Sequence, residues 1–136
     1  MKTIEISTVV DSSIEKAWTY WTEPEHIQNW NFASPDWHCP KAESELKEGG
    51  RFSSRMEAKD GSMGFDFGGH YTKIVPNSTL EYTLDDGREV SIKFSEDNGK
   101  TKIVETFEPE NQNPLDLQRQ GWQAILTNFK NYVESN

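Results

Sequence analysis

The sequence has little cysteine, no long apolar run and no surplus of basic charge. Cys39 is the only cysteine among 136 residues, so the chain cannot form a disulfide within itself. No apolar run approaches the length of a membrane-spanning helix, and the first residues do not resemble a signal peptide. We therefore expect a cytoplasmic protein that has no membrane partner and works in a reducing compartment.

Basic residues are outnumbered by acidic ones. The chain carries 14 Lys and Arg residues against 23 Asp and Glu residues, which gives a formal net charge of −9. The basic residues are scattered, and no cluster of them forms a patch. Polyanions would be repelled by such a surface, so the composition excludes nucleic acid and anionic membranes as expected partners.

Residues with metal-binding or nucleophilic side chains do not occur in the spacings that such sites use. His38 and Cys39 are adjacent, while His26 and His70 lie elsewhere, so no paired zinc-ligand spacing is present. Neighbours in sequence generally project apart, which also disfavours a catalytic Cys-His pair. The glycines of residues 61–69 lack the context of a phosphate-binding loop. We expect no metal and no cofactor.

Aromatic residues are abundant for so polar a chain. They make up 12% of the residues, although all hydrophobic residues together reach only 33%. This bias favours a core or a cavity wall built from large flat side chains. The length predicts one domain, residues 1–136, large enough to bury a core without disulfides or metal.

The longest helical pattern covers residues 113–134. Asn113 is expected to cap the first turn and Pro114 to take the first helical position. Gly121 interrupts the pattern, and we expect a backbone or a ligand to approach closely there. The apolar residues that recur at helical spacing are Trp122, Ile125, Leu126, Phe129, Tyr132 and Val133.

The first third of the chain predicts one strand, two short helices and a long irregular segment. Alternation indicates a strand over residues 3–10, and Ser12 with Glu15 forms a capping-box pattern before a helix. Pro24 opens a second helical piece that runs to Trp30. Residues 31–50 show no clear period, although residues 42–46 are compatible with a short strand. Long loops of this kind are usually functional or mobile.

From residue 51 onward the pattern has a period of two. If the turn at residues 59–62 folds its hairpin symmetrically, Met56 faces Phe65 and Arg55 faces Asp66 on the opposite side. This register makes the aromatic face the inner one and places His70 outside. Further strands alternate around Tyr82, around residues 90–94 and around residues 103–107. The predicted fold is α+β, with a curved antiparallel sheet wrapped around the C-terminal helix.

Several segments in this order resemble a known family. They are VDSSIEKAW at residues 10–18, TEPE at 22–25 with Trp30, GGRF at 49–52, GHYTKIVP at 69–76, LEYT at 80–83 and GWQAIL at 121–126. Their order and spacing resemble the activator-of-heat-shock-protein-90-ATPase-like branch of the START/SRPBCC superfamily, which includes the birch-pollen-allergen-like proteins. The resemblance covers almost the whole chain.

This resemblance implies a helix-grip fold, in which the sheet and the long helix enclose a cavity for an apolar small molecule. Relatives with this fold include lipid and hormone binders, aromatic cyclases and chaperone cofactors, so the fold alone does not select a function. These 136 residues contain no counterpart of the separate N-terminal domain that the chaperone activators use. The segment of residues 29–38 also resembles a bacterial subgroup of uncharacterised members.

Glu105 is the most suggestive polar residue, because strand parity places it inward between Ile103 and Phe107. A carboxyl group in an apolar cavity has a raised pKa and can act as a general acid or base. The alternatives are that parity slips at a bulge, or that Glu105 pairs with an arginine or with nearby hydroxyls.

Three functions follow from these patterns. The first is binding of an apolar or aromatic small molecule, without catalysis being required. The second is an enzyme of cyclase or hydrolase type in which Glu105 performs the chemistry, and the third is a chaperone-assisting or protein-interaction module with an exposed apolar patch. For the first function, Trp30 and Trp37 are expected at the cavity entrance, and the other ligand-binding residues are Met56, Phe65, Phe67, Tyr71 and Trp122.

Overall fold

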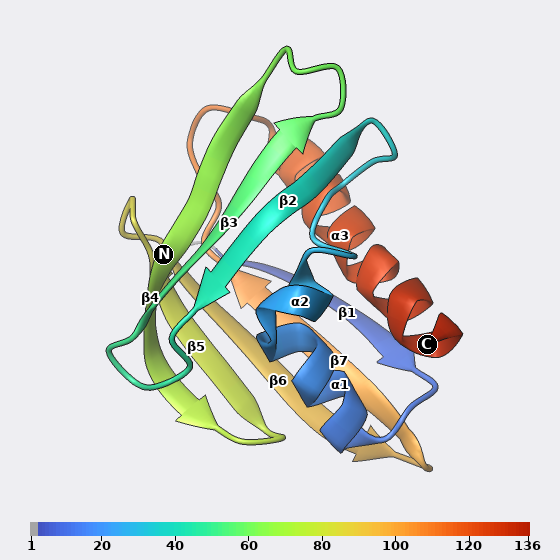
Figure 1. Ribbon diagram of the computed structural model, residues 1–136. Helices are drawn as coiled ribbons and strands as arrows, with labels where there is room; N and C mark the ends of the chain where they lie inside the picture. Colours follow the sequence, from blue (N-terminus) through green and yellow to red (C-terminus); the bar gives the residue numbers. More distant parts are fainter. Residues whose placement is uncertain (1–2) are drawn as a thin grey trace.

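The computed structural model describes residues 3–136, which form a seven-stranded antiparallel sheet and three helices (Figure 1). The elements in chain order are β1 (Ile4–Val10), α1 (Ile14–Thr22), α2 (Pro24–Ile27), β2 (Trp37–Ser44), β3 (Arg51–Ala58), β4 (Gly64–Val75), β5 (Thr79–Leu84), β6 (Glu89–Asp97), β7 (Lys100–Phe107) and α3 (Leu115–Ser135).

The strands lie in the order β1-β7-β6-β5-β4-β3-β2, so hairpin follows hairpin except where β1 joins the sheet beside β7. The sheet curls, as Figure 1 shows, and α3 packs along β1 while α1 contacts β6 and β7. The predicted α+β fold, a curved antiparallel sheet with a long C-terminal helix and two short helices after the first strand, is confirmed.

The hairpin of β3 and β4 has the register that the period of two predicted. Met56 pairs with Phe65, Ser54 with Phe67, and Arg55 with Asp66. Gly69 lies between Phe52 on β3 and Leu84 on β5, and a Cβ atom there would collide with the carbonyl oxygen of Thr83. Glycine therefore allows three strands to approach closely where the sheet curls.

The core is formed by the inner face of the sheet and one side of the helices. Phe129 and Val133 on α3 are fully buried, as predicted. The rings of Trp21 and Trp30 lie edge-on to Phe129, with centroids at 4.7 and 4.9 Å. Tilted and edge-on contacts of this kind add to the burial energy of aromatic side chains.

The N-terminal boundaries of the helices differ from prediction by one residue. Ser13, not Ser12, caps α1, because its hydroxyl accepts a hydrogen bond from the backbone N–H of Lys16 at 3.2 Å. Pro114 occupies the cap position of α3, and Asn113 does not cap the first turn. Ser12 and Ser13 are chemically alike, so only the backbone angles decide between them, whereas α3 begins after Pro114 without any side-chain cap.

Two further predictions are wrong. Residues 37–44 form the edge strand β2, although most of this segment was expected to be irregular; Pro40 and a register shift between His38 and Lys41 obscure its period. A Cβ atom on Gly121 would meet nothing within 4 Å, so no backbone approaches this glycine. The backbone alternative is therefore wrong, while the approach of a ligand at Gly121 stays a prediction.

Candidate functional site

A pocket of about 320 Å³ lies between the inner face of the sheet and the helices. Its residues come from β3, β4, β5 and β7, from α3, and from the segment around α1 and α2. The lining residues are Trp21, Ile27, Trp30, Asn31, Phe52, Ser54, Met56, Phe65, Phe67, Tyr71, Leu80, Tyr82, Arg88, Glu105, Glu110, Asn113, Gln118, Trp122 and Ile125. Most of these side chains are apolar or aromatic, and the polar ones are few, which is the usual make-up of a small-molecule site.

Aromatic rings hold one another in place along the pocket wall. Trp122 stacks on Phe107, with ring centroids 3.9 Å apart and an angle of 7° between the planes. Phe67 meets Trp122 edge-on at 6.0 Å. On the opposite side, Phe52 lies against Tyr71 at 5.1 Å and edge-on to Tyr82 at 4.7 Å. These contacts join α3 to β4 and β7 across the pocket.

Five of the predicted ligand-binding residues line the pocket from within the fold: Trp30, Met56, Phe67, Tyr71 and Trp122. Trp30 is only 4% exposed, and its indole N–H donates to the carbonyl oxygen of Tyr20 at 3.0 Å. It is therefore part of the inner wall, and its predicted place at the entrance is wrong.

Phe65 and Trp37 lie further out. Phe65 lines the pocket with 50% of its surface exposed, so the pocket reaches the surface at this residue. Trp37 contacts Phe65 at a centroid distance of 6.0 Å and is not among the lining residues. Trp37 on the edge strand β2 thus lies beside the opening without lining the pocket, and its role at the entrance stays a prediction.

Glu105 points into the pocket, as strand parity predicted. It is 5% exposed, and its partners in the sheet are Ile6 on β1 and Ile92 on β6. Within residues 3–136 its carboxyl group makes no hydrogen bond, and because no fully buried side-chain oxygen of these residues lacks a partner, the carboxyl oxygens are open to the pocket. Burial in this apolar setting raises the pKa of Glu105 from 4.5 to about 8. The carboxyl group is therefore largely protonated at neutral pH.

Two tyrosines and the buried Ser54 also bring polar groups to the inner wall. The hydroxyl of Tyr71 is hydrogen-bonded to Ser44 Oγ at 2.7 Å. The hydroxyl of Tyr82 makes no hydrogen bond within the described part of the chain, and because no fully buried side-chain oxygen there lacks a partner, this hydroxyl is open to the pocket. Burial raises the pKa of Tyr82 well above 10, and the nearby charge of Glu105 raises it further. Tyr82 and Glu105 are thus neighbouring polar groups that both face the pocket.

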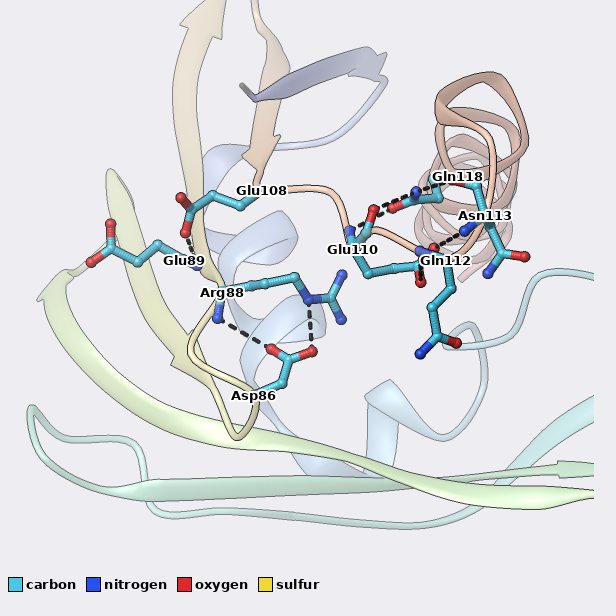
Figure 2. Close-up of polar contacts among 8 residues, drawn as sticks. All are labelled: Asp86, Arg88, Glu89, Glu108, Glu110, Gln112, Asn113 and Gln118. Carbon is cyan, nitrogen blue, oxygen red and sulfur yellow. Dashed lines mark hydrogen bonds and ion pairs between the residues drawn. The ribbon is translucent and has the colours of Figure 1, made fainter. Parts of the chain in front are cut away.

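A second polar group borders the pocket where β7 leads into α3. We call residues 108–114 the connector. The backbone N–H of Glu110 donates to Gln118 Oε1 at 2.9 Å, and Gln118 Nε2 donates to the carbonyl oxygens of Glu110 and Asn113 at 3.0 and 2.8 Å. The Glu110 carboxylate accepts hydrogen bonds from the backbone N–H groups of Gln112 and Asn113. Figure 2 shows how these bonds fold the connector against the first turns of α3.

Arg88 faces the connector from the turn between β5 and β6 (Figure 2). Asp86 holds it through Arg88 Nε at 2.8 Å and through the backbone N–H of Arg88 at 3.1 Å. The positive charge of Arg88 also contributes to lowering the pKa of Glu110. Glu89 and Glu108 are joined by a hydrogen bond from the Glu89 backbone N–H to Glu108 Oε1 at 2.7 Å, and neither residue lines this pocket.

Sequence reasoning found the inner-facing strand residues but missed this polar border. Phe52 and Tyr82 lie on strands that the alternation predicted, but neither residue was assigned to the wall. Arg88, Glu110 and Gln118 gave no signal, because they lie in a turn, in an aperiodic segment and in the first turns of a helix. Charged and amide side chains such as these occur in any solvated loop, so the residue types alone do not identify a site.

The candidate nucleophile and metal ligands lie outside the pocket. Cys39 is buried, and burial raises the pKa of its thiol, which disfavours the reactive thiolate. One group of possible ligands occurs in the described residues: Glu23, Glu25 and His26. The His26 ring is hydrogen-bonded through Nδ1 to the Tyr132 hydroxyl at 2.8 Å and stacks on an aromatic neighbour. Within residues 3–136 no helix is long and apolar enough to cross a membrane.

Comparison with known proteins gives one family and several solved structures. The family model described as "Activator of Hsp90 ATPase homolog 1-like protein" matches residues 11–134. None of the curated protein sequences matches the chain. An AHSA1-like protein from Aeromonas hydrophila is 43% identical, with 98% of this chain and 93% of that chain covered and a TM-score of 0.93.

Two other solved structures extend the comparison. Chr148 from Cytophaga hutchinsonii is 52% identical, with 98% of this chain and 93% of that chain covered and a TM-score of 0.85. Protein CV1439 from Chromobacterium violaceum has the same fold with a TM-score of 0.86 at 19% identity, and each chain is covered over 100% of its length.

Proposed function

Because the chain belongs to the family of Activator of Hsp90 ATPase homolog 1-like proteins, whose fold places a long helix across a curled sheet, we propose that it binds an apolar or aromatic small molecule between the two. The observation that carries this proposal is the lining of the pocket. Aromatic rings from β3, β4, β5 and α3 surround a space of about 320 Å³. Such rings bury a large apolar area for a flat ligand.

The volume limits the size of the ligand. Pockets that bind small molecules usually measure about 300 to 1,000 Å³, so this one suits a molecule of one or two rings. The ligand would contact Phe67 and Trp122 with its flat faces. Phe65, which is half exposed, would cover its outer end.

The test is a titration with tryptophol, a neutral indole that has one hydroxyl group, followed by isothermal calorimetry and by amide chemical shifts. We expect saturable binding, with shifts concentrated around Phe67 and Trp122. Trp122→Ala is expected to weaken binding about tenfold or more, since it removes one wall. Leu46→Ala, at an exposed position between β2 and β3, is the matched control and should leave the affinity unchanged.

Two results would count against the proposal. If indole and naphthalene compounds of this size fail to bind at millimolar concentration, the pocket is not a ligand site. If Trp122→Ala binds as tightly as the unaltered protein, binding occurs elsewhere on the surface.

Glu105 supports a second candidate function, an enzyme of cyclase or hydrolase type. A carboxyl group with a pKa of about 8 is protonated at neutral pH and can donate a proton to a bound substrate as a general acid. Once a substrate is found, Glu105→Gln should abolish turnover and leave affinity within about twofold. Equal turnover in the variant would eliminate Glu105 as the catalytic group.

A chaperone partner stays a prediction from the family resemblance. The exposed large apolar side chains occur on β1, on β4, in the loop before β3, in the turn before β4 and in the first turn of α3: they are Val9, Leu46, Met63, Phe65, Val75, Leu115 and Leu117. Titration calorimetry with the middle domain of a heat-shock-protein-90 chaperone tests this prediction. Absence of heat change at micromolar concentrations would contradict it.

A further inference from the structure

Glu105 is a buried carboxyl group that the fold leaves without a partner. It is 5% exposed, it lines the pocket, and within residues 3–136 it makes no hydrogen bond and no ion pair. Arg88, the one lining residue with a permanent positive charge, is held by Asp86 at the border of the pocket. Buried polar groups are nearly always hydrogen-bonded, so an unpartnered one that faces a pocket indicates a ligand group that would complete it.

The charges around the pocket favour a cationic group over an anionic one. The charged side chains that line the pocket are Glu105, Glu110 and Arg88, and the guanidinium of Arg88 is paired with Asp86. The whole chain has a net charge of −9. A negatively charged ligand would be repelled on approach, whereas a positively charged one would be attracted.

The inner wall also suits a cation. Phe67, Tyr82 and Trp122 present aromatic rings to the same space as the Glu105 carboxyl group. The faces of aromatic rings carry partial negative charge and attract ammonium groups, most strongly where water is excluded. Aromatic rings together with one carboxylate are the groups that recognise an organic amine.

We propose that the ligand of this pocket is an apolar or aromatic amine, whose ammonium group pairs with the Glu105 carboxylate. The proposal rests on the proposed function and names its ligand class. The Tyr82 hydroxyl lines the same pocket and is a second group to which the ammonium nitrogen can donate a hydrogen bond.

Binding of the amine is then coupled to the release of a proton. At pH 7 both Glu105 and the free amine are largely protonated, so forming the ammonium–carboxylate pair releases close to one proton from Glu105 to solvent. The other titratable groups on the pocket wall are Tyr71 on β4, Tyr82 on β5, Arg88 and Glu110. Burial raises the pKa values of both tyrosines, so they stay neutral. The pocket-lining residues of α1, α2, β3 and α3 carry no titratable group.

The experiment compares three ligands that differ in one group: tryptamine, tryptophol and indoleacetate. Affinities are measured by calorimetry at pH 6, 7 and 8, in two buffers of different ionisation enthalpy. We expect tryptamine to bind at least about tenfold tighter than tryptophol at pH 8, and indoleacetate to bind weakest. The tryptamine affinity should rise about tenfold from pH 6 to pH 7, with close to one proton released, while tryptophol shows neither effect.

Two variants assign the effect to its residue. Glu105→Gln keeps the shape of the side chain and should remove the preference for tryptamine while leaving the tryptophol affinity unchanged. Glu110→Gln neutralises the carboxylate at the border and should keep the preference. Circular dichroism spectra of both variants serve as the control that they are folded.

The outcomes separate this inference from the proposed function. If tryptophol binds as tightly as tryptamine, or if Glu105→Gln keeps the preference, the amine inference is overturned while small-molecule binding stands. If Glu110→Gln removes the preference, the pairing with Glu105 is overturned. If none of the three ligands binds, the proposed function fails and the inference fails with it.

Discussion

Replacing Glu105 by glutamine should make the protein more stable at neutral pH. The pKa of this carboxyl group is 4.5 in an unfolded chain and about 8 in the folded protein, so the folded state holds the proton more tightly. Below pH 4.5 both states are protonated and the shift has no effect on stability. As the pH rises from 4.5 to 8 the unfolded state ionises first, and the free energy of unfolding falls by about 1.4 kcal/mol for each pH unit.

This loss amounts to about 3 kcal/mol at pH 7 and levels off above pH 8. It is a large fraction of the 5 to 15 kcal/mol that roughly bounds the stability of natural domains. Glutamine cannot ionise, so the Glu105→Gln variant should not lose this stability. Its free energy of unfolding should therefore exceed that of the unaltered protein at neutral pH.

The assay is urea denaturation of both proteins at pH 5, 6, 7 and 8. The quantity of interest is the difference in unfolding free energy between variant and unaltered protein, which should grow by about 3 kcal/mol in favour of the variant between pH 5 and pH 8. Glu96→Gln, at an exposed position on β6, removes the same charge and should give a flat difference. A flat difference for Glu105→Gln as well would refute the claim that this carboxyl group is buried and unpaired.

Three other substitutions test the packing, each by urea denaturation. Trp122→Ala removes the stack on Phe107 and should lower the unfolding free energy by about 3 kcal/mol; a loss below about 1 kcal/mol would contradict that contact. Gly121→Ala should raise it by about 0.5 to 1 kcal/mol, because the new methyl group meets open space, and a loss would show a neighbour there. Gly69→Ala should cost about 2 kcal/mol or more, since its methyl group collides with the Thr83 carbonyl, and a neutral result would mean that the strands do not approach so closely.

The sheet could be predicted from the sequence because one face of every central strand is buried. Alternation of apolar and polar residues then fixes which side chains point inward, and a shift by one residue would expose all of them. The pairing of Met56 with Phe65 and of Arg55 with Asp66 follows from this constraint. The inward position of Glu105 follows from it too, although a lone carboxylate contradicts the apolar pattern around it.

The parts that could not be predicted lie where no period exists. β2 is an edge strand interrupted by Pro40 and a register shift, so its residues looked irregular in sequence. The connector is shaped by hydrogen bonds between Glu110 and Gln118, which depend on distances in the folded chain. Gly121 is a different case. The sequence suggested that another backbone approaches this helical glycine, and the structure has no neighbour within 4 Å of a Cβ atom there.

The central claim is that the space between the sheet and α3 holds a small aromatic molecule. The most direct test is to record intermolecular nuclear Overhauser effects between bound tryptophol and the protein. The account predicts contacts from the indole protons to the side chains of Phe67, Trp122 and Met56, which line the pocket from β4, α3 and β3. Contacts confined to the exposed leucines Leu115 and Leu117 at the start of α3 would contradict it.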